Sequence, residues 1–171
     1  VAPFLRGKNP LETERVWHDL LKQFNARVQT GMWSSAVSTI DIALWDIKGK
    51  HYKEPVWRLL GGAQNPVQAY ITFGLKQYKK EQLVEVAKQL VAQGEKRLKM
   101  VVAVDPENPK VDAVRVEAVR DAVGDDVELM IDANYLFSFN RAVELCKLVE
   151  PLGITWFEEP VYQNDALLLA Y

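Results

Sequence analysis

Two short apolar runs in the second half of the chain each end in a carboxylate. VELMID ends at Asp132, and ITWFE ends at Glu158, which is 26 residues further on. A strand, a covering helix and the next parallel strand need about this length, so the two acids are expected at neighbouring strand ends. Paired buried carboxylates repel each other unless a cation lies between them. Hard oxygen donors with no Cys or His beside them suit Mg²⁺ better than zinc, so Asp132 and Glu158 are predicted to be metal ligands.

The elements that must position these acids form a repeating pattern of strands and helices. Strands are expected at 68–74, 96–104, 127–132 and 154–158, and helices at 79–94, 106–124 and 138–150. With Phe73, Val101, Asp132 and Glu158 taken as reference positions near the strand ends, the strands are spaced by 28, 31 and 26 residues. This regular spacing predicts βα repeats with right-handed crossovers, and therefore a parallel sheet.

Such a sheet fits either an open doubly wound fold or half of an eight-stranded barrel. About 110 residues cannot close a barrel that needs about 250, which favours the open sheet when the pattern is considered alone. No glycine-rich phosphate loop follows the first expected strand, which weakens the nucleotide-binding version of that fold. Periodicity and length therefore leave both architectures open.

Composition excludes several functional classes. The 171 residues are 49% hydrophobic and 26% charged, as in ordinary globular proteins, and the net charge of −2 argues against a nucleic-acid partner. Apolar runs are too short for a membrane span, and no signal peptide is recognised at Val1. The single cysteine, Cys146, is predicted to be a buried structural thiol, which fits a reducing, cytoplasmic location.

The first part of the chain is predicted to be helical. A helix is expected over 11–24, after Pro10, and another begins near Ser34 and Ser35, which can cap it. This second helix is expected to end at Gly49, and the segment PVWRLLGG follows as a short second turn. Trp33 is expected in a loop before the second helix and is a candidate for substrate contact.

Three segments together resemble one known family. The stretch SAVSTIDIALWDIKGKHYKEPVWRLLGG (35–62), the DAN at 132–134 and the EEP at 158–160 are similar to the enolase superfamily, in its mandelate racemase/muconate lactonizing enzyme branch. The resemblance implies a (β/α)8 barrel rather than an open sheet, with the chain as part of a longer protein. Residues 1–62 would be the helical remainder of an α+β capping domain with its lead-in helix. Residues 63–171 would be the first four βα units of the barrel.

The resemblance also implies roles for individual residues. Asp132 and Glu158 would bind Mg²⁺ with a third acid that this chain does not contain, and Asn134 would lie beside the substrate or the metal shell. Family members carry Lys-x-Lys on the second strand, and its second lysine removes the proton α to a carboxylate. Lys99 matches the first position, so Val101 stands where the base is expected. In the alternative register Arg97 and Lys99 form the pair, and Lys99 is then the base.

A valine at the base position leaves three outcomes open. A His–Asp pair from the rest of the barrel could remove the proton from the other face of the substrate. Tyr135, which follows the DAN, or Lys99 itself could take over that role. The protein could also be catalytically altered or inert. Beside the site, Trp156 is expected in the barrel core, and Glu159 is expected in a salt bridge beneath it.

The function that the resemblance implies is a magnesium-dependent lyase. It would remove the proton α to the carboxylate of a sugar acid, giving a metal-stabilised enediolate, and then eliminate water. The alternatives are a racemase, epimerase or cycloisomerase with the same first step, or a non-catalytic binding module. A homo-oligomer is expected, and the present segment alone is expected to be inactive.

Overall fold

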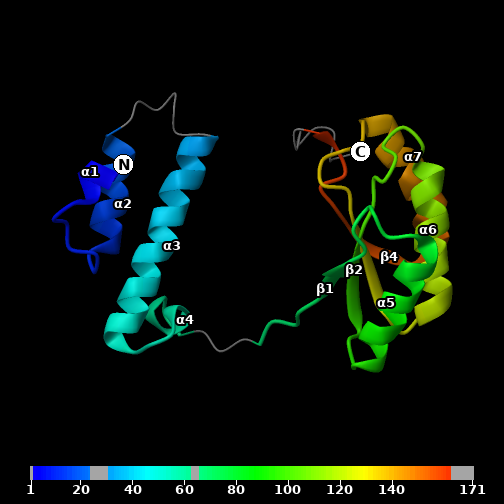
Figure 1. The fold of residues 1–171 in the computed structure, drawn as a ribbon, viewed down its shortest axis with the longest axis horizontal. Helices are drawn as coiled ribbons and strands as arrows, with labels where there is room; N and C mark the ends of the chain where they lie inside the picture. The colour runs from blue at the N-terminus through cyan, green and yellow to red at the C-terminus, as the bar shows by residue number, and fades with distance from the viewer. Residues whose placement is uncertain (1, 24–30, 63–65, 163–171) are drawn as a thin grey trace. The chain divides into compact units, whose positions relative to one another are not determined.

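The chain divides into two compact units, Val1–Pro66 and Val67–Tyr171, each of which has its own core. The structure is a computed structural model that describes residues 2–23, 31–62 and 66–162 (Figure 1). No helix in these ranges is both long and apolar enough to cross a bilayer. The boundary predicted after residue 62 falls four residues before the end of the first unit.

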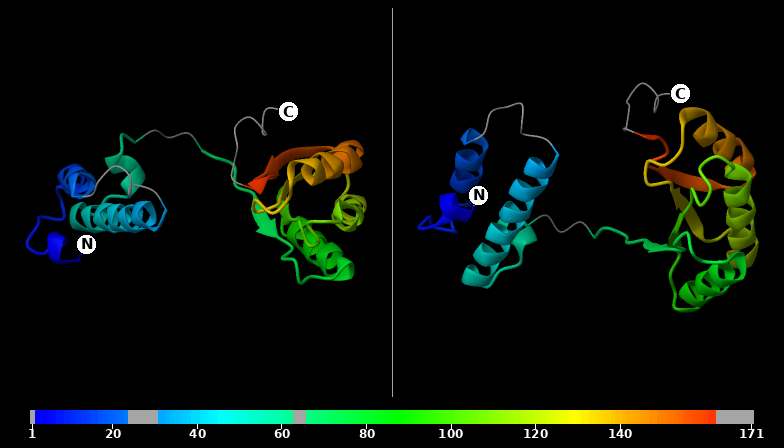
Figure 2. Two further views of the ribbon diagram at one scale, coloured as in Figure 1. Left: turned by 90° about the horizontal axis from the view of Figure 1, so that it is seen from above. Right: turned by 45° about the horizontal axis from the view of Figure 1, so that its top comes forward.

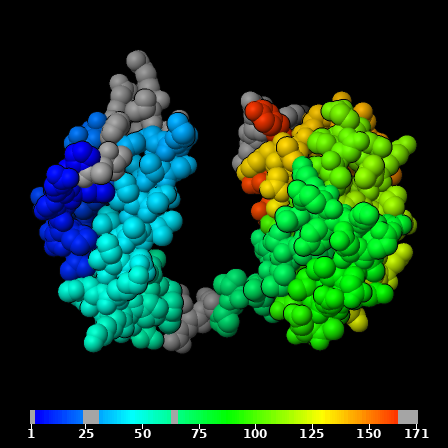
Figure 3. Space-filling view, viewed as in Figure 1, coloured from blue at the N-terminus to red at the C-terminus, as the bar shows by residue number. Residues whose placement is uncertain are grey.

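The first unit is helical in its described part. Its helices are α1 (Ala2–Leu5), α2 (Thr13–Lys22), α3 (Met32–Tyr52) and α4 (Val56–Leu59). Figure 3 shows α3 (cyan) alongside α2 (blue), and their shared core is formed by the buried Val16, Leu20, Val37 and Leu44. This packing follows from apolar residues at helical spacing on each helix.

Both predicted ends of the second helix are corrected by α3. The helix begins at Met32 with Gly31 as its N-cap residue, so neither Ser34 nor Ser35 caps it. It continues past Gly49 and ends at Tyr52. The chain then turns back, and the carbonyl oxygen of Glu54 lies close to Gly49. A Cβ at position 49 would lie only 2.9 Å from that oxygen. The glycine therefore permits a close backbone approach inside the helix instead of ending it.

The second unit is a four-stranded parallel sheet in the order β1-β2-β3-β4. Its elements in chain order are β1 (Ile71–Phe73), α5 (Lys80–Ala92), β2 (Arg97–Val101), α6 (Pro109–Val123), β3 (Glu128–Asp132), α7 (Phe139–Val149), the 3₁₀ turn η2 (Glu150–Leu152) and β4 (Ile154–Glu158). Figures 1 and 2 show α5, α6 and α7 on one side of this sheet. Sequential strands with every helix on one face form a barrel segment, whereas a doubly wound sheet carries helices on both faces.

The main core lies between the sheet and its helices. Alternate residues of β2 and β3 point into it, and Leu98, Met100, Leu129 and Ile131 are fully buried there. The opposite set of side chains, which includes Lys99 and Asp132, lines the other face of the sheet. The period-two alternation thus separates a packing face from a face that carries charge.

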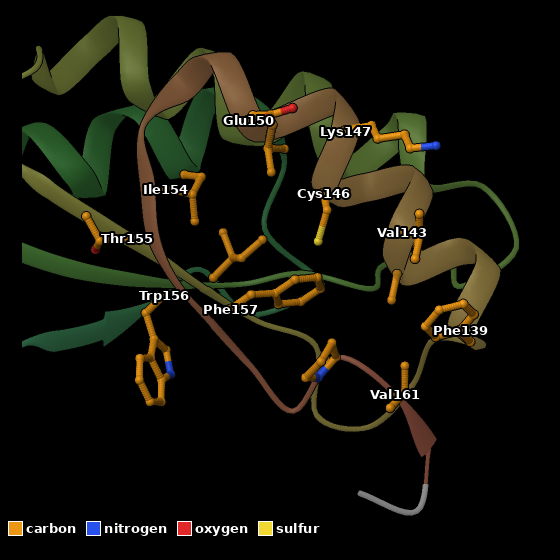
Figure 4. Close-up of a pocket in the computed structure, with 14 residues that line it drawn as sticks. Phe139, Val143, Cys146, Lys147, Glu150, Ile154, Thr155, Trp156, Phe157 and Val161 are labelled. Carbon is orange, nitrogen blue, oxygen red and sulfur yellow. The ribbon is translucent and has the colours of Figure 1, made fainter. Parts of the chain in front are cut away.

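An apolar groove follows the outer edge of β4. It has a volume of about 560 Å³ and is lined by α7 and β4 side chains that include Phe139, Cys146 and Phe157 (Figure 4). Cys146 is exposed in the described part of the chain, so its predicted burial is wrong. Trp156, predicted to lie in the barrel core, is 59% exposed. Both residues line this groove, and β4 has no strand partner on its outer side among the described residues.

Arg120 on α6 forms hydrogen bonds with the turns that precede β3 and β4. Its side chain is 7% exposed and donates to the carbonyl oxygens of Leu152 (2.9 Å), Gly153 (3.4 Å), Gly124 (2.7 Å) and Val127 (2.7 Å). One guanidinium therefore satisfies acceptors in two successive turns that lead into strands. This clamp lies at the end of the sheet opposite Asp132 and Glu158.

Replacing Arg120 by alanine is expected to lower the free energy of unfolding by about 3 kcal/mol or more, since each buried polar group left without a partner costs ~1–3 kcal/mol. Urea denaturation followed by circular dichroism measures the change. The matched control is Arg141→Ala on α7, whose side chain is 39% exposed and pairs with Glu144 at 2.8 Å. That exposed pair contributes at most about 1 kcal/mol. Equal losses in the two variants would contradict a clamping role for Arg120.

Candidate active site at the carboxyl ends of the strands

Asp132 and Glu158 lie side by side at the carboxyl end of the sheet. The parallel register pairs Asp132 with Glu158 on one side and with Val101 on the other. These three residues form one row across β2, β3 and β4. The neighbouring carboxylates predicted from the strand spacing are therefore found together, and a valine completes their row.

Lys99 lies one row deeper and extends to both acids. Its Nζ is 2.6 Å from Glu158 Oε2 and 3.2 Å from Asp132 Oδ2. It also donates to the hydroxyl of Tyr70 at 3.2 Å. Lys99 is only 5% exposed and Asp132 only 7%. A buried lysine with this set of partners is not a surface charge, because burial without a counter-charge would be strongly unfavourable.

The environment of Lys99 keeps it protonated. Burial opposes the charged form, but hydrogen bonds to Glu158, Tyr70 and Asp132 together with the charge of Asp132 outweigh it. The pKa of Lys99 is therefore raised above its ordinary value. In this arrangement Lys99 supplies positive charge and hydrogen bonds, and it is a poor base.

The two registers proposed for the lysine motif differ clearly in geometry. Val101 shares the row of Asp132 and Glu158, as expected if Lys99 is the first residue of the motif. Arg97, the partner in the alternative register, pairs with Glu128 at 2.8 Å near the amino end of the sheet. This geometry favours the register in which valine takes the position of the base.

Asp132 is oriented by the backbone that follows it. The Asn134 N–H donates to Asp132 Oδ1 at 2.9 Å, which leaves Oδ2 for the cation. Asn134 itself is exposed at the mouth of the sheet. This turn fixes one carboxylate oxygen to the main chain and turns the other toward Glu158 and Lys99.

Non-glycine residues with left-handed backbone gather at this end of the sheet. They are Ala103 (φ 57°) after β2, Asn134 (φ 50°) and Tyr135 (φ 61°) after β3, and Glu159 (φ 46°) after β4. Each such residue costs about 1–2 kcal/mol relative to ordinary backbone. Strain of this kind concentrates at functional sites, where it directs side chains that a regular strand would turn away.

The loop after β2 is held by a buried acid on α6. Asp112 is fully buried, accepts from the Val104 N–H at 3.2 Å and pairs with Arg115 at 3.0 Å. Burial raises the pKa of Asp112, and these hydrogen bonds and the Arg115 charge partly offset the rise. Asp112 thereby holds the left-handed turn at Ala103, two residues after Val101.

Tyr135 and Glu159 form a second pair beside the acids. The Tyr135 N–H donates to the Glu159 carbonyl at 2.8 Å. The side-chain hydrogen bond with Glu159 raises the pKa of the Tyr135 hydroxyl, with smaller contributions from burial and from the nearby carboxylates. No ion pair of the described residues includes Glu159, so the salt bridge predicted for it is not found. Its left-handed backbone breaks the strand alternation on which that prediction relied.

Trp33 and Tyr70 complete the list of candidate residues. Trp33 lies in the first turn of α3, not in a loop, and packs against the α2–α3 core. Its predicted substrate contact stays a prediction, because the two units are described separately. Tyr70 was not predicted, although its position two residues before Thr72, which pairs with Lys99, places it on the charged face of the sheet.

The donor set at this edge fits part of a magnesium site. Asp132 Oδ2 and Glu158 Oε2 both lie within 3.2 Å of one nitrogen, so they converge on a common point. Carboxylate oxygens are the ligands that Mg²⁺ prefers, and Mg²⁺ is commonly bound through one or two carboxylates together with substrate and water. Within the described ranges, no third His, Cys, Asp or Glu joins these two.

A parallel barrel segment with acids that converge at the carboxyl ends of its strands is the arrangement found in TIM-barrel enzymes. Residues 1–61 match the N-terminal domain of mandelate racemase/muconate lactonizing enzymes, and residues 82–171 match the family described as enolase C-terminal domain-like. The chain belongs to the mandelate racemase/muconate lactonizing enzyme family of the enolase superfamily. The family relationship and the barrel architecture expected from the sequence are thus confirmed.

Relatives in this family catalyse different reactions. The chain is 36% identical over 99% of its length to arabinonate dehydratase of Saccharolobus solfataricus, of which it spans 45%. A crystal structure of the 3,6-anhydro-D-galactonate cycloisomerase from Zobellia galactanivorans matches with 38% identity and a TM-score of 0.88, over 98% of this chain and 46% of that one. A Streptomyces coelicolor racemase with bound magnesium matches with 30% identity and a TM-score of 0.85, over 98% and 46% respectively. The chain therefore spans less than half the length of these relatives.

The raised pKa of Tyr135 predicts that its phenolate forms only above pH 10.0, the ordinary midpoint for tyrosine. Ultraviolet absorbance is followed against pH for the wild type and for Tyr135→Phe, both in a chelating buffer. The difference between the two curves isolates this transition. In the Glu159→Gln protein the midpoint is expected to fall toward the ordinary value, because the negative hydrogen-bond partner is lost. A midpoint below 10.0 in the wild type would show that Tyr135 is available as a base.

Proposed function

We propose that the complete protein is a magnesium-dependent lyase that removes the proton α to the carboxylate of a sugar acid and then eliminates water. The observation that carries this proposal is the convergence of Asp132 Oδ2 and Glu158 Oε2 on one cation at the carboxyl end of a barrel sheet. The similarity to arabinonate dehydratase supports the reaction and the class of substrate. The magnesium in the similar racemase structure supports the metal.

Asp132 and Glu158 would hold the metal ion. When bound, Mg²⁺ would stabilise the negative charge that develops on the substrate carboxylate as the α-proton leaves. Lys99, which lies on the same face of the sheet within reach of these acids, would contribute a second positive charge to the binding of the same carboxylate. The Asn134 N–H keeps Asp132 oriented, so the chain fixes these charges before the substrate arrives.

The choice of lyase over racemase rests on Val101. Racemisation through a planar intermediate needs a proton acceptor on one face of the substrate and a donor on the other. Val101 has no titratable group in the row of Asp132 and Glu158, and Lys99 lies one row deeper than these acids. We infer that the α-proton is taken from the other face, by a residue outside the described part of the chain.

Tyr135 is better suited to donate a proton than to act as the base. Its hydroxyl stays protonated beside Glu159, so it can donate a hydrogen bond or a proton at the mouth of the site. A donor at this position would assist a departing hydroxyl group of the substrate. The proposal therefore assigns Tyr135 to the elimination step.

Cycloisomerisation is the second candidate. The similarity to the 3,6-anhydro-D-galactonate cycloisomerase, at 38% identity, favours it specifically. Both reactions can begin with removal of the same type of proton, and they differ in whether the oxygen that leaves carbon is lost or remains tethered in a ring. The row of Val101, Asp132 and Glu158 is compatible with either outcome.

Mg²⁺ is expected to stabilise the complete protein, by about 2.7 kcal/mol at a concentration one hundred times the Kd. Asp132→Asn and Glu158→Gln should each abolish most of this gain, because each removes a charged ligand. Asp126→Asn, at an exposed acid in the turn before β3, is the matched control and should keep it. Thermal unfolding with and without Mg²⁺ provides the measurement. A gain that persists in both ligand variants would place the metal elsewhere.

A screen of aldonic and aldaric acids with the complete protein and Mg²⁺ is expected to yield a 2-keto product from at least one substrate. Conducting the reaction in D₂O separates the alternatives. An enzyme with a base on only one face of the substrate exchanges the α-proton or eliminates water, and it does not invert the α-carbon. A ring-opened or ring-closed isomer with no loss of water would select cycloisomerisation. Deuterium incorporation with inversion would overturn the assignment of a lyase.

A further inference from the structure

The Lys99 ammonium is the counter-ion of both acids in the metal-free protein. It contacts Glu158 Oε2 at 2.6 Å and Asp132 Oδ2 at 3.2 Å, and these are the two oxygens that face the common point. Oδ1 of Asp132 is already used by the Asn134 N–H. On Asp132, the oxygen left for a metal ion is therefore the oxygen that Lys99 contacts.

A divalent ion and an ammonium cannot both remain against the same oxygens. Mg²⁺ binds carboxylate oxygens at about 2.0–2.1 Å, and an ammonium held against the same oxygens would be repelled by it. Lys99 and Asp132 are both nearly inaccessible to solvent, so water does little to screen this repulsion. Loading the metal must therefore move the ammonium.

Tyr70 provides a place for the displaced ammonium. Its hydroxyl accepts from Lys99 Nζ at 3.2 Å, and Nζ lies 4.8 Å from the centre of its ring. Tyr70 precedes β1, which borders β2 on the side away from β3, so it draws Lys99 away from the acids. The lysine stem is flexible, and the ring face and hydroxyl both stabilise a cation.

We propose that Lys99 is an exchangeable internal cation: it neutralises Asp132 and Glu158 in the metal-free protein, and Mg²⁺ displaces it toward Tyr70. There the ammonium is released from the acids and becomes available to an anionic group of the substrate. The metal and Lys99 therefore compete for the same oxygens, and metal binding must precede the contact between Lys99 and substrate. This inference rests on the magnesium site of the proposed function and adds to it the exchange and the role of Tyr70.

The exchange predicts opposite changes in Mg²⁺ affinity for two variants. Lys99→Met keeps the length of the side chain and removes the competing charge, so Mg²⁺ should bind about tenfold more tightly or better. Tyr70→Phe removes a hydroxyl that Lys99 already contacts and that must hold the ammonium without the acids once Mg²⁺ is bound, so Mg²⁺ should bind several-fold more weakly. Arg97→Met, on the same strand but paired with Glu128, is the matched control and should change the affinity less than about twofold.

Isothermal titration of the complete protein with MgCl₂ measures all three affinities without relying on activity. Unchanged or weaker binding by Lys99→Met, with normal binding by the wild type, would overturn the exchange and leave the metal site intact. No binding by the wild type would instead remove the metal site and the exchange with it. If Lys99→Met does not fold, Tyr70→Phe decides: weaker binding supports the exchange, and unchanged binding contradicts it.

Discussion

The charge balance among Lys99, Asp132 and Glu158 is the constraint on which the carboxyl end of the sheet depends. Two carboxylates in neighbouring strands would repel each other in a buried row, and one ammonium from a third strand compensates them only in part. The surrounding turns fix one oxygen of Asp132 to the main chain and leave the other directed at the cation. This incompletely neutralised cluster is the basis for the proposed site of a divalent metal and an anionic substrate.

Much of the architecture could be predicted because it depends on local periodicity. The alternation of apolar strands and amphipathic helices located the βα units, and the spacing from Asp132 to Glu158 placed these acids in adjacent strands. Periodicity could not distinguish an open sheet from a barrel, because both repeat the same unit. The side of the sheet on which the helices lie decides that question, and this is a property of crossovers rather than of composition.

The features that were predicted wrongly, or not at all, depend on neighbours far away in the sequence. Cys146 on α7 has the pattern of a buried residue, but its burial depends on what packs beyond the outer strand β4. Trp33 was assigned to a loop because Gly31 indicates a break, whereas here that glycine serves as a helix cap. Tyr70 was overlooked because a single tyrosine before a three-residue strand has no chemical signature until its partner Lys99 is known.

Arg120 and the acids divide the sheet into two ends with different tasks. The guanidinium secures the turns that enter β3 and β4, while the acids and the left-handed turns occupy the ends where the strands leave. Because the clamp shares no residue with the charged cluster, the loops beyond the acids can accumulate sequence drift without loosening the frame. A scaffold divided in this way lets the loops around the charged cluster change while the fold is kept, in keeping with the different reactions of the relatives.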